Sequence, residues 1–196
     1  MGNPILRTAL TDEASISGDH SLNEAPLIGK INIRGDSNSL DFINAIESVL
    51  GLTPPIEANT CHHSEQSALF WLGPDEWLVH VAIESVDVIM ADLQAAFGDM
   101  HCAMIEVSDY FSVIELSGQF ARSIINSSSP FDIRANHFKT GQCAQTLFGH
   151  AAVLIWPVDD KPSFALQVRW SHAKYVYEYL AQSIRNAENL DTFEHR

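Results

Sequence analysis

The most informative stretch of this sequence is ALFWLGPDEWLVHVAI at residues 68–83. Two apolar runs flank Gly73-Pro74-Asp75-Glu76, and a glycine–proline pair followed by acidic residues is typical of a tight turn. The pattern therefore predicts a β-hairpin with arms at Ala68 to Leu72 and Trp77 to Ile83.

The residues on either side of this hairpin predict a complete β-α-β-β-α unit. A short alternating strand at Lys30 to Arg34 leads into a turn at Gly35 and Asp36. A helix follows, whose apolar residues recur at helical spacing: Leu40, Ile43, Ile46 and Leu50. After the hairpin, Ser85 is placed to cap a second helix, which we expect to end at Gly98.

The second half of the chain repeats this order of elements. A strand at Phe111 to Leu116 leads through a turn at Gly118 to a short helix that stops before Pro130. A second hairpin follows, with arms at Ala151 to Trp156 and Ser163 to Trp170, and a helix begins after it.

Equivalent positions of the two halves keep a nearly constant separation of 83 to 87 residues. The three pairs are Gly35 and Gly118, Trp77 and Phe164, and Ser85 and Ser171. Unrelated halves are not expected to preserve both the order and the offset. We therefore predict an α+β fold built from duplicated β-α-β-β-α units, in which helices cover an antiparallel sheet.

The domain organisation follows from this repeat. Residues 26–186 are expected to form a single duplicated domain with halves at about 28–99 and 103–186, because each half alone is too small to be very stable. Residues 1–25 are polar and weakly periodic, which predicts a disordered or extended tail. Residues 187–196 are expected to form a shorter C-terminal tail.

Composition excludes several classes of protein. The formal charge is −14, with 25 acidic and 11 basic residues, which argues against nucleic-acid binding. No apolar run approaches the roughly 18 residues of a membrane span, and the first residues lack the pattern of an export signal. We therefore expect a cytoplasmic protein with neither nucleic-acid nor membrane partners. Only 18% of the residues are charged, which is compatible with a large surface reserved for a protein partner.

Candidate catalytic and metal-binding residues are few. Cys61, His62 and His63, with Glu65 nearby, are metal-ligand types, but side chains of adjacent residues diverge and no second ligand pair follows at a suitable spacing. Cys143 has no base near it in the sequence. The sequence therefore predicts no catalytic residue and no metal site in this chain.

Two glycines and one turn are candidate binding sites. Gly35 and Gly118 each separate a strand from a helix, but neither belongs to a phosphate-binding motif, so tight turns are the favoured interpretation. Asp75 and Glu76 are able to accept hydrogen bonds from a ligand, although turn formation is favoured for Asp75. No cofactor-binding residue is predicted. An exposed Trp71 or Trp77 would suit a docking face at this hairpin.

Three segments of the chain, in this order and spacing, resemble the γ subunit of heterotetrameric sarcosine oxidase. They are Leu69 to Leu78, Val107 to Asp109 with Ile114 to Arg122, and Phe138 to Gln142 followed by Arg169 to Ala173. The resemblance covers roughly residues 28–185, and its most specific part is the string Trp-Leu-Gly-Pro-Asp-Glu-Trp at residues 71–77.

This resemblance implies a function within a larger enzyme. Such complexes oxidatively demethylate sarcosine and transfer the one-carbon unit to tetrahydrofolate. The resemblance implies larger α and β flavoprotein subunits and a small δ subunit as partners, with FAD, FMN, NAD and tetrahydrofolate on those partners and none on this chain. It also implies a fold similar to the folate-dependent aminomethyltransferases. The γ subunit would be non-catalytic and support the α subunit.

Three alternatives remain open at this stage. The chain could be a stand-alone folate-binding or aminomethyl-transfer protein, a γ-type subunit of a related N-methyl amino acid dehydrogenase, or a free-standing acidic scaffold. The first is weakened by Lys139-Thr140-Gly141-Gln142-Cys143, which has the letters of a folate-protein motif in the wrong order.

Overall fold

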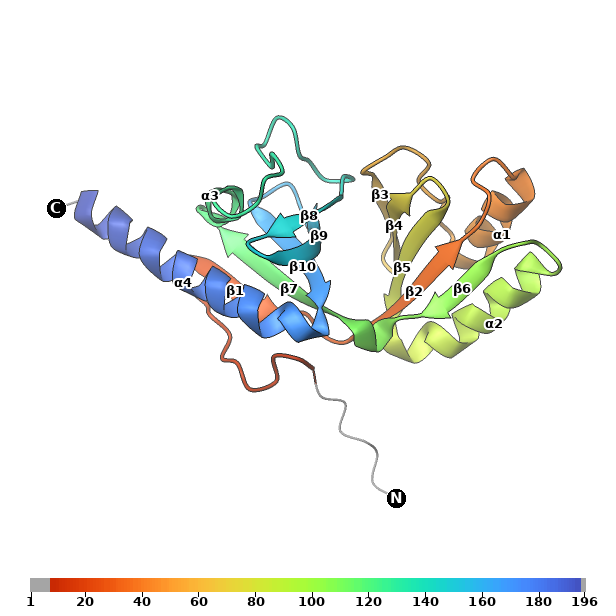
Figure 1. Cartoon of the computed structure of the whole chain (residues 1–196), viewed down its shortest axis with the longest axis horizontal. Coiled ribbons are helices and arrows are strands. Elements are labelled where there is room, and N and C mark those ends of the chain that lie inside the picture. The colour runs from red at the N-terminus through yellow and green to blue at the C-terminus, as the bar shows by residue number, and fades with distance from the viewer. Residues whose placement is uncertain (1–7, 195–196) are drawn as a thin grey trace, which may run out of the picture. The chain divides into compact units, whose positions relative to one another are not determined.

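The computed structural model describes the backbone of residues 8–194 and the side chains of residues 8–189 (Figure 1). The chain forms two compact units, and each unit is built from more than one stretch of the sequence. The first contains the described residues up to Pro26 together with Tyr110–Thr140 and the residues from Thr146 onward. The second contains Leu27–Asp109 and Gly141–Gln145. A short segment from the second half of the chain thus belongs to the unit formed by the first half.

The unit that contains Leu27–Asp109 has one five-stranded antiparallel sheet and two helices. Its strand order is β3-β4-β5-β2-β6. The elements are β2 (Ile28–Arg34), α1 (Leu40–Leu50), β3 (Cys61–His63), β4 (Ser67–Gly73), β5 (Glu76–Ala82), a 3₁₀ turn (Ile83–Ser85), α2 (Val86–Phe97) and β6 (Ala103–Glu106). The predicted hairpin is confirmed as β4 and β5, and the strand expected near residues 104–107 is β6.

The core of this unit lies between the sheet and its two helices, which cover the same face (Figure 1). Alternation along β5 sends Trp77, Val79 and Val81 to that face, where they pack against the helices. Phe42 of α1 stacks on Phe97 of α2 with ring centroids 5.3 Å apart. Burial of these apolar side chains is the main force that holds the unit together.

The other unit has the same strand arrangement. Its sheet order is β1-β7-β10-β9-β8, so that β7 and β10 occupy the places that β2 and β5 occupy in the first sheet. The elements are β1 (His20–Glu24), a 3₁₀ turn (Ser108–Tyr110), β7 (Phe111–Gly118), α3 (Ala121–Asn126), β8 (Ala144–Phe148), β9 (Ala151–Pro157), β10 (Ser163–Arg169) and α4 (Trp170–Glu194). The second predicted hairpin is therefore confirmed as β9 and β10.

The structure differs from the sequence prediction in three places. Residues 8–194 form two five-stranded sheets, whereas we predicted one sheet. Residues 20–24 of the predicted N-terminal tail form β1, because β7 offers them a complete antiparallel partner. Residues 187–194 of the predicted C-terminal tail continue α4 to Glu194. Residues 1–7 and 195–196, the outer parts of both predicted tails, lie outside the described residues.

The backbone ahead of β1 is also held by α4. The hydroxyl of Tyr177 donates to the carbonyl of Ala14 at 2.6 Å and lies 3.3 Å from the carbonyl oxygen of Leu22 in β1. These contacts stabilise a stretch whose composition gave little sign of order. Over residues 8–194 no helix is both long enough and apolar enough to cross a membrane.

Candidate functional site

The cysteine and histidines of β3 are divided between the two faces of their sheet. Cys61 is buried, whereas His62 and His63 are exposed. His62 Nδ1 donates to the carbonyl of Thr53 at 2.7 Å, and His63 Nε2 lies 3.2 Å from Cys61 Sγ. Because side chains alternate along a strand, Cys61 and His63 lie on one face of the sheet and His62 lies on the other. Among the described residues, no three His, Cys, Asp or Glu side chains are arranged to hold a metal ion.

Cys143 lies beside Cys61 because residues 141–143 add a short antiparallel bridge to the unit. Cys61 N donates to Gly141 O and Cys143 N donates to Asn59 O, each at 2.9 Å. The Cys143 thiol donates to Thr60 O at 3.2 Å. Both thiols are buried. Sequence reasoning missed this pair because its members are more than 80 residues apart and share no local motif.

The electrostatics of this pair argue against thiol catalysis. The hydrogen bond with Cys143, and then burial, raise the pKa of the Cys61 thiol well above its ordinary value. Burial, and then the neighbouring His62, lower the pKa of His63. The imidazole therefore stays neutral at neutral pH and does not supply the positive charge that would stabilise a thiolate. The buried cysteines contribute packing and hydrogen bonds to this unit.

An open pocket of about 490 Å³ lies on the same unit, at the turn after β2. Its lining residues are Arg34, Gly35, Asp36, Asp75, His101, Cys102 and Ala103. The guanidinium of Arg34 lies 3.0 Å from Glu76 and 3.9 Å from Asp75, so its charge is compensated within the protein. This pairing leaves little positive charge to attract a phosphate.

Gly35 serves the close approach of β2 and α1. A Cβ atom at this position would lie 2.4 Å from the ring of Phe42. The Gly35 N–H donates to the carbonyl of Asp75 at 3.0 Å and so is occupied by the hairpin turn. These contacts agree with the interpretation of Gly35 as a turn residue.

The hairpin tryptophans have opposite environments. Trp77 is fully buried, and its indole N–H donates to Pro55 O at 2.7 Å. Trp71 is only partly buried. The suggestion that Trp77 serves as a docking residue is therefore wrong, because its side chain belongs to the core. Glu76 accepts from Asn32 Nδ2 at 2.8 Å and pairs with Arg34, so this acidic side chain is also occupied within the protein.

The buried side chain of His20 packs closely against Gly118. Its φ of +125° strains any residue with a side chain, and a Cβ atom would lie 2.4 Å from the His20 ring. His20 Nε2 accepts from Phe120 N at 3.1 Å, and Nδ1 lies 3.3 Å from a carboxylate oxygen of Glu188. This glycine therefore has a structural role.

Comparison with known proteins gives a consistent picture. The profile of the family described as "Sarcosine oxidase, gamma subunit family" matches residues 34–186. The sarcosine oxidase subunit gamma of Corynebacterium sp. (strain P-1) is 27% identical over 172 residues, covering 88% of this chain and 83% of the relative. That of Arthrobacter sp. is 28% identical over 155 residues, covering 79% of this chain and 75% of the relative.

Solved structures show the same fold. A chain of the heterotetrameric sarcosine oxidase from Corynebacterium sp. U-96, in complex with pyrrole 2-carboxylate, superposes with a TM-score of 0.84 at 21% identity, covering 93% of this chain and 96% of that chain. The glycine cleavage system aminomethyltransferase T from Bartonella henselae superposes with a TM-score of 0.59 at 13% identity, covering 81% of this chain but 44% of that enzyme. The implied likeness to an aminomethyltransferase fold is thus confirmed.

Proposed function

We propose, since the chain belongs to the sarcosine oxidase gamma subunit family, that it is a non-catalytic subunit of a heterotetrameric sarcosine oxidase. The complex would demethylate sarcosine oxidatively and pass the one-carbon unit to tetrahydrofolate. The observation that carries the proposal is the match over residues 34–186, together with the TM-score of 0.84 to a chain of such an enzyme.

The local chemistry of the chain supports a non-catalytic role. The Cys61 thiol is buried with a raised pKa, and the charge of Arg34 is compensated by Asp75 and Glu76. The chain corresponds to less than half of the aminomethyltransferase whose fold it shares. These features favour support of a larger catalytic chain over catalysis or folate binding by this chain alone.

The proposed partners are larger α and β flavoprotein subunits and a small δ subunit. We place FAD, FMN, NAD and tetrahydrofolate on these partners and assign the γ chain the role of supporting the α subunit. No observation on the described residues favours the folate-enzyme alternative or the dehydrogenase alternative over this one. A cytoplasmic location of the complex stays a prediction.

Co-purification tests this function. The tagged chain, co-expressed with the genes that neighbour its own, is expected to bring down larger flavin-containing chains in a fixed ratio. The isolated chain is expected to show no flavin absorbance and no heat of binding when titrated with tetrahydrofolate. Recovery of the chain alone from the co-expression would refute the proposal, and binding of tetrahydrofolate by the isolated chain would favour a stand-alone folate protein.

We also propose that the two units are copies of one β-α-β-β-α unit and that residues 26–186 behave as a single duplicated domain. The matching strand orders, β3-β4-β5-β2-β6 and β8-β9-β10-β7-β1, support the duplication. The exchange of segments supports joint folding, because the second unit includes Gly141–Gln145 from the other half of the chain.

Scanning calorimetry of the full chain tests joint folding. We expect one transition whose calorimetric and van't Hoff enthalpies agree, because neither unit is completed by a continuous piece of sequence. Two separated transitions would show that the units unfold independently and would contradict the single-domain proposal.

A further inference from the structure

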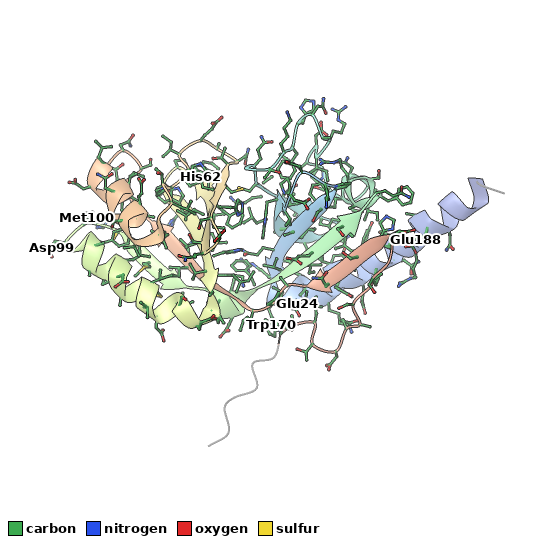
Figure 2. All side chains as sticks on the ribbon, turned by 180° about the vertical axis from the view of Figure 1, so that it is seen from behind. Glu24, His62, Asp99, Met100, Trp170 and Glu188 are labelled. Carbon is green, nitrogen blue, oxygen red and sulfur yellow. The ribbon has the colours of Figure 1, made fainter. Side chains whose placement is uncertain are left out.

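Three residues of types that are common in protein interfaces lie where β7 begins and β10 ends. In the antiparallel register Arg169 of β10 stands opposite Phe111 of β7. Tyr110 comes just before β7 and Trp170 just after β10, so both lie beyond the paired ends of these strands. The guanidinium carbon of Arg169 lies 5.0 Å from the centroid of the Tyr110 ring. Trp170 begins α4, where Figure 2 labels it.

This cluster, defined as Tyr110, Arg169 and Trp170, is exposed. Tyr110 is 48% exposed and Trp170 is 38% exposed. The other three tryptophans of the chain are buried or partly buried. Trp, Tyr and Arg are the residues that most often dominate the energy of protein–protein association. Trp and Tyr bury a large area for few lost rotamers. The other strongly exposed apolar residues of this protein are mostly single aliphatic side chains.

The charge of Arg169 indicates the chemistry of the partner. Some surface cations pair with carboxylates of the chain, such as Arg34 with Glu76, and Arg134 with Asp132 at 2.6 Å. The residues that the structure describes place no carboxylate within 4.0 Å of the Arg169 guanidinium, although acidic residues outnumber basic ones by 25 to 11. Its guanidinium instead lies over the Tyr110 ring, which fixes its position and leaves its charge uncompensated.

We propose that the cluster of Tyr110, Arg169 and Trp170 is an anchor for a larger subunit of the complex. The segment that docks there presents a carboxylate to Arg169 and an apolar side chain to Trp170. An ion pair that loses its water on docking stabilises a complex only when each charge meets an opposite charge. Arg169 supplies the positive charge, and its contact with Tyr110 holds it in a fixed position. This inference rests on the proposed function, because it takes the partner from the complex.

The experiment measures the affinity of the purified chain for the immobilised complex of its remaining subunits. Arg169→Glu and Trp170→Ala are each expected to raise the Kd about 30-fold, the size of an interface hot spot. Arg185→Glu, near the other end of α4, is the matched charge control, and Leu40→Ala removes an apolar side chain that is 75% exposed in the other unit. Both controls are expected to stay within about threefold of the wild type.

A second measurement separates the contribution of the Arg169 charge to binding from the contribution of side-chain packing. Added salt is expected to weaken binding of the wild type more than binding of Arg169→Gln, because the wild type alone forms the ion pair. If Trp170→Ala fails to fold, the surface variants of Arg169 decide the question, and circular dichroism reports folding for each.

The outcomes are distinguishable. Unchanged Kd values for folded Arg169→Glu and Trp170→Ala would overturn the anchor while leaving the proposed function in place. A change confined to self-association would also overturn it and would assign the cluster to contacts between copies of this chain. Failure of the wild-type chain to bind would instead refute the proposed function.

Discussion

Replacing Trp77 by alanine is expected to lower the free energy of unfolding by about 3–5 kcal/mol, which is the range for removal of a large aromatic side chain from a core. Trp77 is fully buried among the side chains of β2, α1 and α2. Its ring lies 5.6 Å from that of Phe42, and its indole N–H donates to Pro55 O. Alanine would leave a cavity and an unpaired carbonyl at the same place.

Urea denaturation followed by circular dichroism measures this effect. Trp71→Ala is the matched control, because Trp71 is the cross-strand partner of Trp77 but is only partly buried. We expect the control to cost less than half as much. Equal losses for the two variants would show that the core is not where the structure places it. Any loss of assembly by Trp77→Ala should follow the unfolded fraction, since this residue is not on the surface.

Replacing Gly118 by alanine is expected to destabilise the chain by about 2–4 kcal/mol, from a strained backbone and an overpacked site together. The φ of +125° disfavours any residue with a Cβ atom, and that atom would lie 2.7 Å from Asp19 O as well as 2.4 Å from His20. Movement of His20 would break its hydrogen bond with Phe120 N and its contact with Glu188.

Gly73→Ala is the control for this substitution. A Cβ atom at Gly73 would have its nearest neighbour at 3.7 Å, and its φ is not in the left-handed region. We expect this control to change the midpoint of urea denaturation by little. A Gly118→Ala variant as stable as the control would contradict the close packing of the β7 end against His20.

The elements that the sequence could predict are those with strong local signals. Gly73-Pro74 between two apolar runs identified β4 and β5, and helical spacing identified α1. β1 was missed because HSLNE is short and polar, and its stability comes from β7, more than 90 residues later. The sequence also could not reveal the proximity of Cys61 and Cys143, which depends on the bridge between Thr60 and Gln142.

The tryptophans show a second limit of prediction from the sequence. Trp71 and Trp77 are equally prominent in the sequence, and only the packing of the helices on the sheet shows that Trp77 is enclosed in the core whereas Trp71 is partly exposed. The sequence does not predict Trp170 as a surface residue, because the pattern places it at the end of a strand. The structure instead places it at the start of α4, directly after Arg169, with a side chain that is 38% exposed. Exposure of a side chain is set by tertiary packing, which periodicity describes only in part.

Native mass spectrometry of the co-purified complex tests the central claim most directly. We expect one copy of this chain with larger subunits. After gentle dissociation the chain should appear at the mass of its bare polypeptide, while the flavins stay with its partners. A chain that runs alone under conditions in which its partners assemble, or one that retains a flavin or a folate, would contradict the account.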